Sequence, residues 1–367
     1  MHEEKKRILE MVKEGLLNAD EALILLEQIE KKNESDEVAE KPESRELSTV
    51  VQQDNAQTEN QSTIKKTSSA LDKFMGIVDG VVKKIKDVDF DFNFGPSVDI
   101  SHIYHHEGTT IRHIDIDIAN GEVTILPSNQ HTIDIECDAK IYRVENTTEA
   151  REKLLKEVTY SVKGDALRFA VQERSIKLNA VIRVPNVQYD EMKIRLFNGS
   201  ITGEKMKVDT IKTKTGNGSI KFQDIFSKDA EFETVNGSIK LHQFEIGELE
   251  VETMNGAIEA EGAYRKSDLQ TINGNIKCIQ TGHYGETIRA KASTGSITLN
   301  IPETASCDGE LKSSLGGFNM DLKGIQIIEE KNDVVQKLLR FQSNMDTEHS
   351  MHILAESKTG SIQVKHV

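Results

Sequence analysis

The sequence predicts a mainly β protein: a single-domain β-solenoid, or β-helix-like stack, of repeats of about 19 residues, preceded by a small α-helical hairpin and an amphipathic helix. Three observations predict it. The phrase Asn-Gly-Ser-Ile recurs at a nearly fixed step, apolar residues alternate with polar ones on both sides of it, and the composition changes abruptly before the repeats begin. A short fixed period is typical of a solenoid, because each unit can bury its apolar face only against its neighbours.

The repeat is clearest between residues 191 and 300. Asn-Gly-Ser-Ile begins at Asn198, Asn217 and Asn236, and variants follow with steps of 19, 18 and 21 residues. Related units extend the array in both directions. The predicted turn residues are Asn120, Gly121, Asn198, Gly199, Asn217, Gly218, Asn236, Gly237, Asn255, Gly256, Asn273, Gly274, Gly295, Gly316 and Gly360.

Apolar residues occupy fixed offsets from each turn. One such column, three residues after the Asn, is Ile201, Ile220, Ile239, Ile258, Ile276 and Ile297. Alternation with a period of two indicates strands with one buried face. The alternation changes phase across Asn-Gly, so we expect a corner there, with Gly accepting the left-handed dihedral angles that it needs. Stacked units would also set the Asn side chains in a ladder.

Asn-Gly is also the strongest short signal for a type I′ hairpin, which would give a meander or a sandwich. Each unit here holds one Asn-Gly and a second, less regular turn such as Gln223-Asp224, which favours the solenoid. Both interpretations remain open at the level of the sequence. Two inserts, Glu149–Val158 and Asn332–Phe341, have the apolar spacing of helices.

Residues 1–32 are predicted to form a hairpin of two short helices. Such a pair is too small to bury enough surface alone. Its apolar stripe therefore meets another copy, another part of the chain or a protein partner, and it includes Leu9, Val12, Leu16, Leu23 and Leu26. Residues 33–66 are rich in Glu, Ser, Asp, Gln and Asn and contain no aromatic residue, which predicts a disordered acidic linker.

Residues 67–88 carry the cleanest helical pattern, and residues 89–367 form the predicted β-repeat domain. The apolar face of the helix consists of Leu71, Phe74, Met75, Val78, Val81, Val82 and Ile85. Two positions for this face are open: it caps an exposed end of the β-stack, or it lies on a membrane with its lysines near anionic lipids. The polar face mixes acidic and basic residues, which favours the cap.

Composition excludes several classes of protein. The net charge of −15 argues against a nucleic-acid partner, because binding to phosphates depends on clusters of Lys and Arg. No apolar run approaches the length of a membrane span, and no secretory signal is visible at the N-terminus. The three cysteines form no Cys-x-x-Cys pair, which fits a reducing compartment. We therefore expect a cytoplasmic protein, with a peripheral position at the membrane or a non-classical route to the cell surface left open.

No catalytic, cofactor-binding or metal site is predicted, and we expect that the chain is not an enzyme. His102, His105, His106 and His113 cluster in an early strand, but alternation divides them between two faces. The serine of Asn-Gly-Ser recurs in many copies, whereas a nucleophile needs one activated site. A row of Glu231, Glu250 and Glu252 would suit a polysaccharide-active β-helix, yet outward-facing glutamates also serve solubility.

The β region resembles the bacterial putative-adhesin family of β-strand-repeat proteins, a domain of unknown function with recurring Gly-Ser/Asp-Ile units. The N-terminal hairpin is similar to the short SHOCT-like bihelical module that often precedes that domain, as in Firmicute proteins of the YvlB and LiaX type. The resemblance implies a non-enzymatic interaction or scaffold protein linked to the cell-envelope stress response. The helical module would bind a partner or self-associate. The alternatives are a peripheral membrane sensor that uses residues 67–88 and, less favoured, a polysaccharide-active enzyme.

Overall fold

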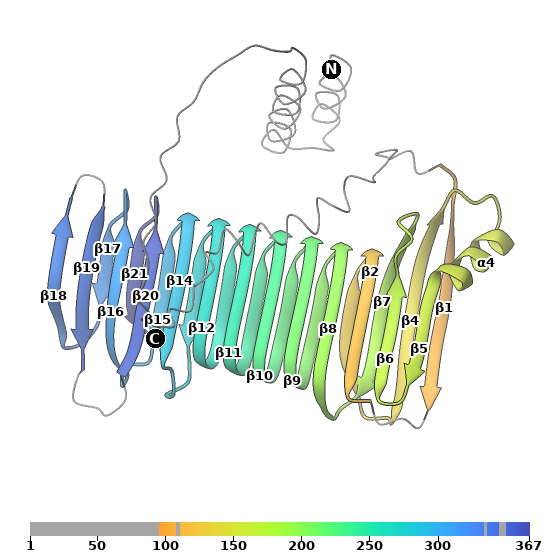
Figure 1. The fold of residues 1–367 in the computed structure, drawn as a ribbon, viewed down its shortest axis with the longest axis horizontal. Coiled ribbons are helices and arrows are strands. Elements are labelled where there is room, and N and C mark those ends of the chain that lie inside the picture. The colour runs from red at the N-terminus through yellow and green to blue at the C-terminus, as the bar shows by residue number, and fades with distance from the viewer. Residues whose placement is uncertain (1–94, 108–110, 334–335, 345–349) are drawn as a thin grey trace, which may run out of the picture. The chain divides into compact units, whose positions relative to one another are not determined.

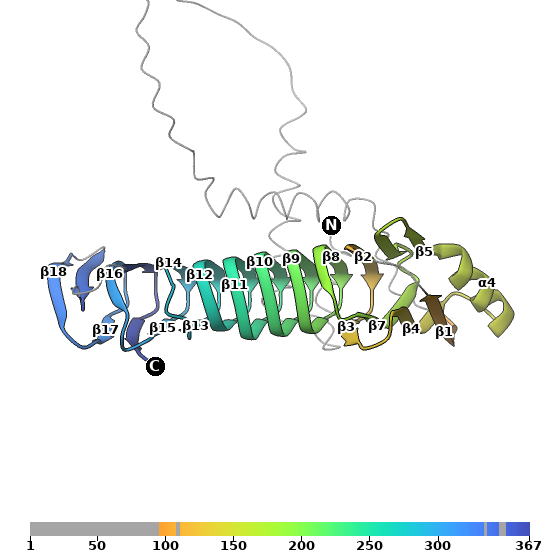
Figure 2. The same ribbon diagram turned by 90° about the horizontal axis from the view of Figure 1, so that it is seen from below.

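The computed structural model describes residues 95–107, 111–333, 336–344 and 350–367. The predicted hairpin, linker and amphipathic helix lie outside these residues. The described chain forms a long, flattened β-solenoid whose strands run across its long axis (Figures 1 and 2). Its elements are β1 Ser97–Glu107, β2 His113–Asn120, β3 Val123–Ser128, β4 Thr132–Tyr142, α4 Thr147–Glu157, β5 Val158–Lys163, β6 Ala166–Val171, β7 Ile176–Pro185, β8 Gln188–Asn198, β9 Ile201–Asn217, β10 Ile220–Asn236, β11 Ile239–Asn255, β12 Ile258–Asn273, β13 Ile276–Gln280, β14 Thr287–Thr294, β15 Ile297–Ile301, β16 Ser306–Ser313, β17 Phe318–Asp321, β18 Ile325–Asn332, β19 Lys337–Ser343, β20 Ser350–Ser357 and β21 Ile362–His366.

The centre of the stack consists of β9, β10, β11 and β12, which pair in parallel and in register. Each of these strands turns a corner within its length. At that corner Lys205, Asp224 and Gln243 have φ values of 52°, 59° and 53°, in the left-handed region. In each rung, the part of the strand that follows an Asn-Gly turn therefore belongs to one sheet. The part that precedes the next turn belongs to the other sheet.

The core lies between the two sheets. The isoleucine column after the turn points into it, and Ile201, Ile220 and Ile239 are completely buried. Parallel pairing between successive repeats excludes the meander, in which neighbouring strands run antiparallel. The predicted solenoid is therefore confirmed.

The coil that comes first in the chain, formed by β2 and β3, lies between two coils that come later in the chain. On one side β2 pairs with β8 and β3 with β9, and on the other side β2 pairs with β6 and β3 with β7. Beyond β6 and β7 the pairing becomes antiparallel, through β5 on one sheet and through β4 and β1 on the other. Helix α4 packs at this end against β1, β4 and β5 and buries Ala150 and Leu154.

The last coil is inserted in the same way. Strands β20 and β21 lie between the coil of β14 and β15 and the coil of β16 and β17, with parallel pairing on both sides. Two antiparallel strands, β19 and then β18, extend one sheet beyond β16. The order of the coils in space thus differs from their order in the chain at both ends.

The two predicted helical inserts have different outcomes. The first is a helix, because Asn146 accepts the backbone N–H of Glu149 through its side chain and so caps α4. The second prediction, a helix at residues 332–341, is wrong. This segment ends β18 and forms most of β19, where Leu339 and Phe341 alternate with outward residues and bury themselves beside β16.

Candidate interaction surface

The predicted turn residues stack along one corner of the solenoid. The amide of each Asn donates to the side-chain oxygen of the Asn on the neighbouring rung, from Asn273 through Asn255, Asn236, Asn217 and Asn198 to Asn120, with distances of 2.7 to 2.8 Å. Asn120 ends the row by donating to the backbone oxygen of Arg174 at 2.8 Å. Like groups bond to like, so the ladder holds the rungs in register. Because these side-chain amides bond each other, the Asn-Gly motif has a structural role.

The glycines of this corner are required mainly by close approach. The sequence-based expectation of left-handed dihedral angles holds at Gly121, Gly199, Gly218 and Gly295, with φ between 132° and 154°. It is wrong at Gly237, whose φ lies outside that region. There a Cβ atom would lie 2.0 Å from the carbonyl oxygen of Gly218, so any side chain would separate the rungs. Gly256, Gly274, Gly316 and Gly360 follow the same pattern.

The feature best suited to interaction is the outer face of the sheet that precedes each turn. Alternation places the residues three and five positions before each Asn-Gly on this face, and most of them are charged. On β2 these residues are Asp115 and Asp117, and on β8 they are Lys193 and Arg195. We call this surface the charged face.

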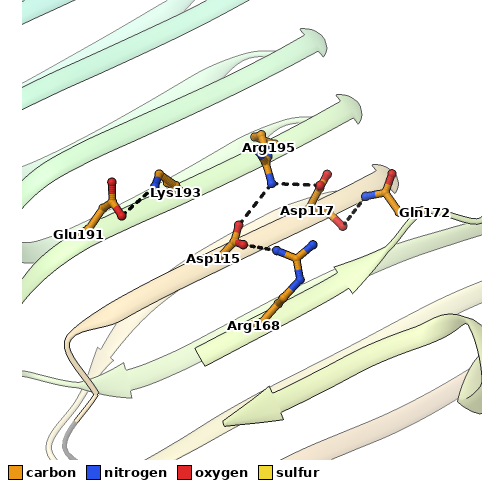
Figure 3. A network of polar contacts seen from close by, with 7 residues as sticks. All are labelled: Asp115, Asp117, Arg168, Gln172, Glu191, Lys193 and Arg195. Carbon is orange, nitrogen blue, oxygen red and sulfur yellow. Dashed lines mark hydrogen bonds and ion pairs between the residues drawn. The ribbon is translucent and has the colours of Figure 1, made fainter. Parts of the chain in front are cut away.

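Figure 3 shows how charges on neighbouring strands meet at one end of this face. Asp115 lies between Arg168 of β6, with which it forms an ion pair, and Arg195 of β8, whose Nη2 is 3.5 Å from Asp115 Oδ1. The same Nη2 is 3.2 Å from Asp117 Oδ2, and Lys193 bonds Glu191 on its own strand at 2.8 Å. These side chains are between one-fifth and one-half exposed, so each pair contributes on the order of 1 kcal/mol or less.

The sign of the charge alternates in bands along the face. After the aspartates of β2 come the basic residues of β8 and β9, and then the acidic residues of β10, β11 and β12. We define the acidic band as Glu231, Glu233, Glu250, Glu252 and Asp268. Basic residues return on β14, where Arg289 Nη1 lies 3.8 Å from Asp268 and Lys291 lies 3.7 Å from Glu356 of β20. A shallow hollow of about 570 Å³ runs across this region and is lined by Lys212, Glu231, Glu250, Asp268 and Arg289, among others.

Two glutamates of the acidic band, Glu233 and Glu252, lie on the outer face of the sheet and are nevertheless buried. Glu233 and Glu252 are 7% and 0% exposed. Lys214 Nζ contacts Glu231 Oε1 at 2.7 Å and Glu233 Oε2 at 2.9 Å. Burial, together with the hydrogen bond to Glu231, raises the pKa of Glu233 to about 8. The pKa of Glu231 falls to about 2 despite its partial burial, because it is hydrogen-bonded to Glu233 and Lys214. The pair therefore holds one proton near neutral pH.

A second hollow, of about 680 Å³, lies beside the charged face at the bend of the rungs. Its walls include the aromatic side chains of Phe226 and Tyr284, which are 46% and 86% exposed. Lys228 pairs with Asp209 at 2.7 Å and Arg265 pairs with Glu248 at 2.6 Å on its rim. The hollow thus combines exposed rings with charged groups that are already paired.

The other candidate groups from the sequence do not gather into a site within the described ranges. His105 bonds Asp134 and Glu107, at 2.6 Å and 3.2 Å, which raises its pKa. No group of three or more His, Cys, Asp or Glu residues in the part of the chain that the structure describes is placed to hold a metal ion. Cys137, Cys278 and Cys307 are buried thiols whose pKa is raised to about 12 by desolvation. No helix among the described residues is long and apolar enough to cross a membrane.

Sequence reasoning found only part of the charged face. It singled out Glu231, Glu250 and Glu252 but missed Glu233, Lys214 and the aspartates of β2. The signal was present, because charges occupy the same two offsets in nearly every repeat. The pairing of Asp115 with Arg195 was not accessible, since these residues are 80 positions apart and meet only because the first coil is inserted beside the third. The predicted faces on residues 9–26 and 71–85 lie outside the described residues.

The fold and its charged outer face define a class of protein: a parallel β-solenoid that presents a long regular surface. The chain belongs to the Toastrack DUF4097 family, whose model matches residues 111–365, and residues 3–34 match a SHOCT-like domain. A relative from Bacillus subtilis, the uncharacterized protein YvlB, is 42% identical over 369 residues, covering 100% of this chain and 99% of the relative. The family resemblance inferred from the sequence is thereby confirmed.

Two solved structures align with most of this chain at low sequence identity. A putative adhesin from Bacteroides fragilis has 13% identity and a TM-score of 0.41, and the match covers 73% of this chain and 97% of that one. A putative adhesin from Parabacteroides merdae has 10% identity and a TM-score of 0.37, with coverage of 72% and 95%.

Proposed function

We propose that this protein is a non-enzymatic interaction scaffold linked to the bacterial cell-envelope stress response. The β-solenoid is the rigid part, and the SHOCT-like hairpin of residues 1–32 is a tethered module that binds a protein partner or a second copy of the chain. The observation that carries the proposal is the charged face. It repeats over many rungs as bands of opposite charge, which suits recognition of an extended partner better than the positioning of one reacting group.

The chemistry of the acidic residues supports binding over catalysis. A glycosidase needs one carboxylic acid and one carboxylate on opposite sides of a bond, both accessible to the sugar. Glu233 is almost entirely buried, and Glu231 is engaged by Lys214. These contacts give the row an electrostatic role within the face. We place the protein in the cytoplasm, peripheral to the membrane, and protease treatment of intact and of lysed cells tests this: degradation in intact cells contradicts it.

The interaction role is tested on the hairpin. We expect Leu16→Asp/Leu26→Asp, or deletion of residues 1–32, to change the oligomeric mass measured by light scattering or to remove a partner recovered by affinity capture. The β signal in circular dichroism should remain, because the solenoid has its own core. The control is Lys13→Ala/Gln28→Ala, which leaves the apolar stripe intact. If mass and captured partners are the same for all variants, the hairpin is not the binding module.

A further inference from the structure

We infer that the acidic band of β10, β11 and β12 is a docking surface for the amphipathic segment of residues 67–88 of the same chain. This inference is separate from the stress-response role and from the hairpin. It concerns a contact within one molecule, between the charged face and the lysine-bearing segment that precedes the β domain. Three properties of the described residues lead to it: an apolar row beside the carboxylates, a local loss of exposure, and the position where the described chain begins.

The first property is an apolar row on the outside of the sheet. Val235, Met254 and Ile272 each directly precede the Asn of their rung, so alternation turns them outward beside the acidic band, and each is partly exposed. At the same offset on the next two rungs of the stack stand Ser293 and Lys358. On the other side, Gly216 interrupts the row, and the ring of Phe197 beyond it lies under the guanidinium of Arg174. The apolar row beside the carboxylates is thus continuous over the three acidic rungs and ends on both sides of them.

The second property is a local minimum of exposure on the charged face. In the column three residues before the turn, the side chains of Arg195 and Lys214 are 49% and 40% exposed. Exposure falls to 10% at Glu233 and to zero at Glu252, and it returns to 45% at Lys291. Carboxylates are rarely fully buried, and an outward one loses its contact with solvent only where other groups lie against it. The minimum marks the middle of the acidic band as a contact site.

The segment of residues 67–88 has the complementary chemistry. Its apolar stripe matches the apolar row, and Lys83, Lys84 and Lys86 gather near its C-terminal end, where they can meet the carboxylates. Asp72 and Asp79 of the same polar side lie about three turns and one turn before Lys83. Lysine suits this arrangement because its long stem packs on apolar surface while its charged end reaches an acidic group. An amphipathic helix laid along the row would cover apolar surface and neutralise a band of like charge at once.

The length of chain fits this position. The described chain starts at Gly95, just before β1, and β1 belongs to the sheet opposite the charged face. The acidic band lies five to seven strands farther along the stack, which is about 24 to 34 Å at the usual spacing, and on the other sheet, about 10 Å across the core. Six extended residues, 89–94, span roughly 20 Å, and 22 helical residues span about 33 Å. The segment can therefore reach the band of its own chain without a second copy.

Zero-length carbodiimide crosslinking of the full chain tests the contact, because it joins an amine to a carboxylate only where the two touch. We expect mass spectrometry to find Lys83, Lys84 or Lys86 joined to Glu250, Glu252 or Asp268. Mixing isotope-labelled with unlabelled chains shows whether a crosslink lies within one chain. Crosslinks between chains would overturn the proposal in favour of a second copy. Absence of these crosslinks would overturn the proposal too, whether or not the protein floats with phosphatidylglycerol vesicles.

Two substitutions distinguish docking from accidental contact. Val78→Asp/Val82→Asp keeps every lysine and leaves the solenoid untouched, so we expect the crosslinks to fall about fivefold or more. Asp72→Asn is the control on the polar side. On the solenoid, Glu250→Lys should make trypsin cleave after Lys83, Lys84 and Lys86 about fivefold faster, whereas Glu356→Lys, on the same face but outside the band, should not. Equal crosslinking and equal cleavage in all variants would show that the segment does not dock on the band.

Discussion

The hydroxyl of Thr253 donates a hydrogen bond to the carbonyl oxygen of Gly237, 3.0 Å away on the neighbouring rung. The same contact is made by Thr215, Thr234 and Thr271 with the turn glycine of the preceding rung, at 2.9 to 3.0 Å. The threonine column thus has two roles. Its branched side chain fits a strand, and its hydroxyl satisfies a backbone carbonyl at the corner where the sheet cannot.

Replacing this hydroxyl tests the second role. We expect Thr253→Val, which keeps the shape of the side chain, to lower the free energy of unfolding by about 1 to 3 kcal/mol, because the Gly237 carbonyl loses its partner in a buried place. Thr253→Ser keeps the hydroxyl and should lose less. Urea unfolding of the three proteins measures the difference. A valine variant as stable as the wild type would show that the contact contributes nothing.

The sequence was sufficient to predict what one rung looks like. The turn and the isoleucine column are local patterns, and the physics that fixes them acts within about ten residues or between copies of one motif. Helix α4 was also predictable, since Leu154 lies at helical spacing from other apolar residues in its insert and Asn146 caps the first turn.

The order of the rungs was not predictable from the same patterns. Asn120 and Asn198 belong to equivalent units, and nothing local to either says that they are neighbours across 78 positions. The mistaken helix at residues 332–341 has the same cause. Leu338 and Leu339 fit a helical stripe, but the free edge of β16 offers backbone hydrogen bonds that a strand can use. The charge bands from β8 to β14 follow the order of the chain, whereas the position of Asp115 and Asp117 beside Arg195 follows from the altered rung order and could only be seen in the structure.

The corner glycines give a second prediction. Gly237→Ala should lower the free energy of unfolding by about 3 kcal/mol, because its Cβ would lie 2.0 Å from the oxygen of Gly218 and the rungs would have to separate. Gly237→Val should be worse. The control is Gly317→Ala, where a Cβ meets no atom within 4 Å. Thermal unfolding of the pair checks this, and equal melting temperatures would contradict the close approach.

The isoleucine column gives a third. Ile239 is completely buried between the two sheets, so Ile239→Asp places an unpaired charge in the core of the central rung. We expect a loss of roughly 3 to 5 kcal/mol. Lys240→Asp, on the next residue and on the exposed outer side, should change stability little. Circular dichroism melts of both variants decide the matter, and similar melts would mean that the column does not form the core.

The raised pKa of Glu233 gives a pH dependence whose sign can be worked out. The unfolded chain releases this proton near pH 4.5, whereas the folded chain keeps it until about pH 8. Between these values the folded state binds the additional proton, so the contribution of Glu233 to stability is full below pH 4.5 and is lost as the pH rises to 8. The pKa of Glu231 is about 2, so its own contribution is present above pH 4.5 and constant through this window.

Glu233→Gln removes this titration and keeps the size of the side chain. We expect the variant to gain stability relative to the wild type as the pH increases from 5 to 8, measured as the free energy of unfolding in urea at each pH. The control is Glu356→Gln on the same face, where the side chain is 46% exposed, so its difference from the wild type should stay nearly constant. Groups that titrate in all three proteins, such as His105, cancel in these differences. Parallel curves for wild type and Glu233→Gln would mean that Glu233 is already ionised in the folded protein.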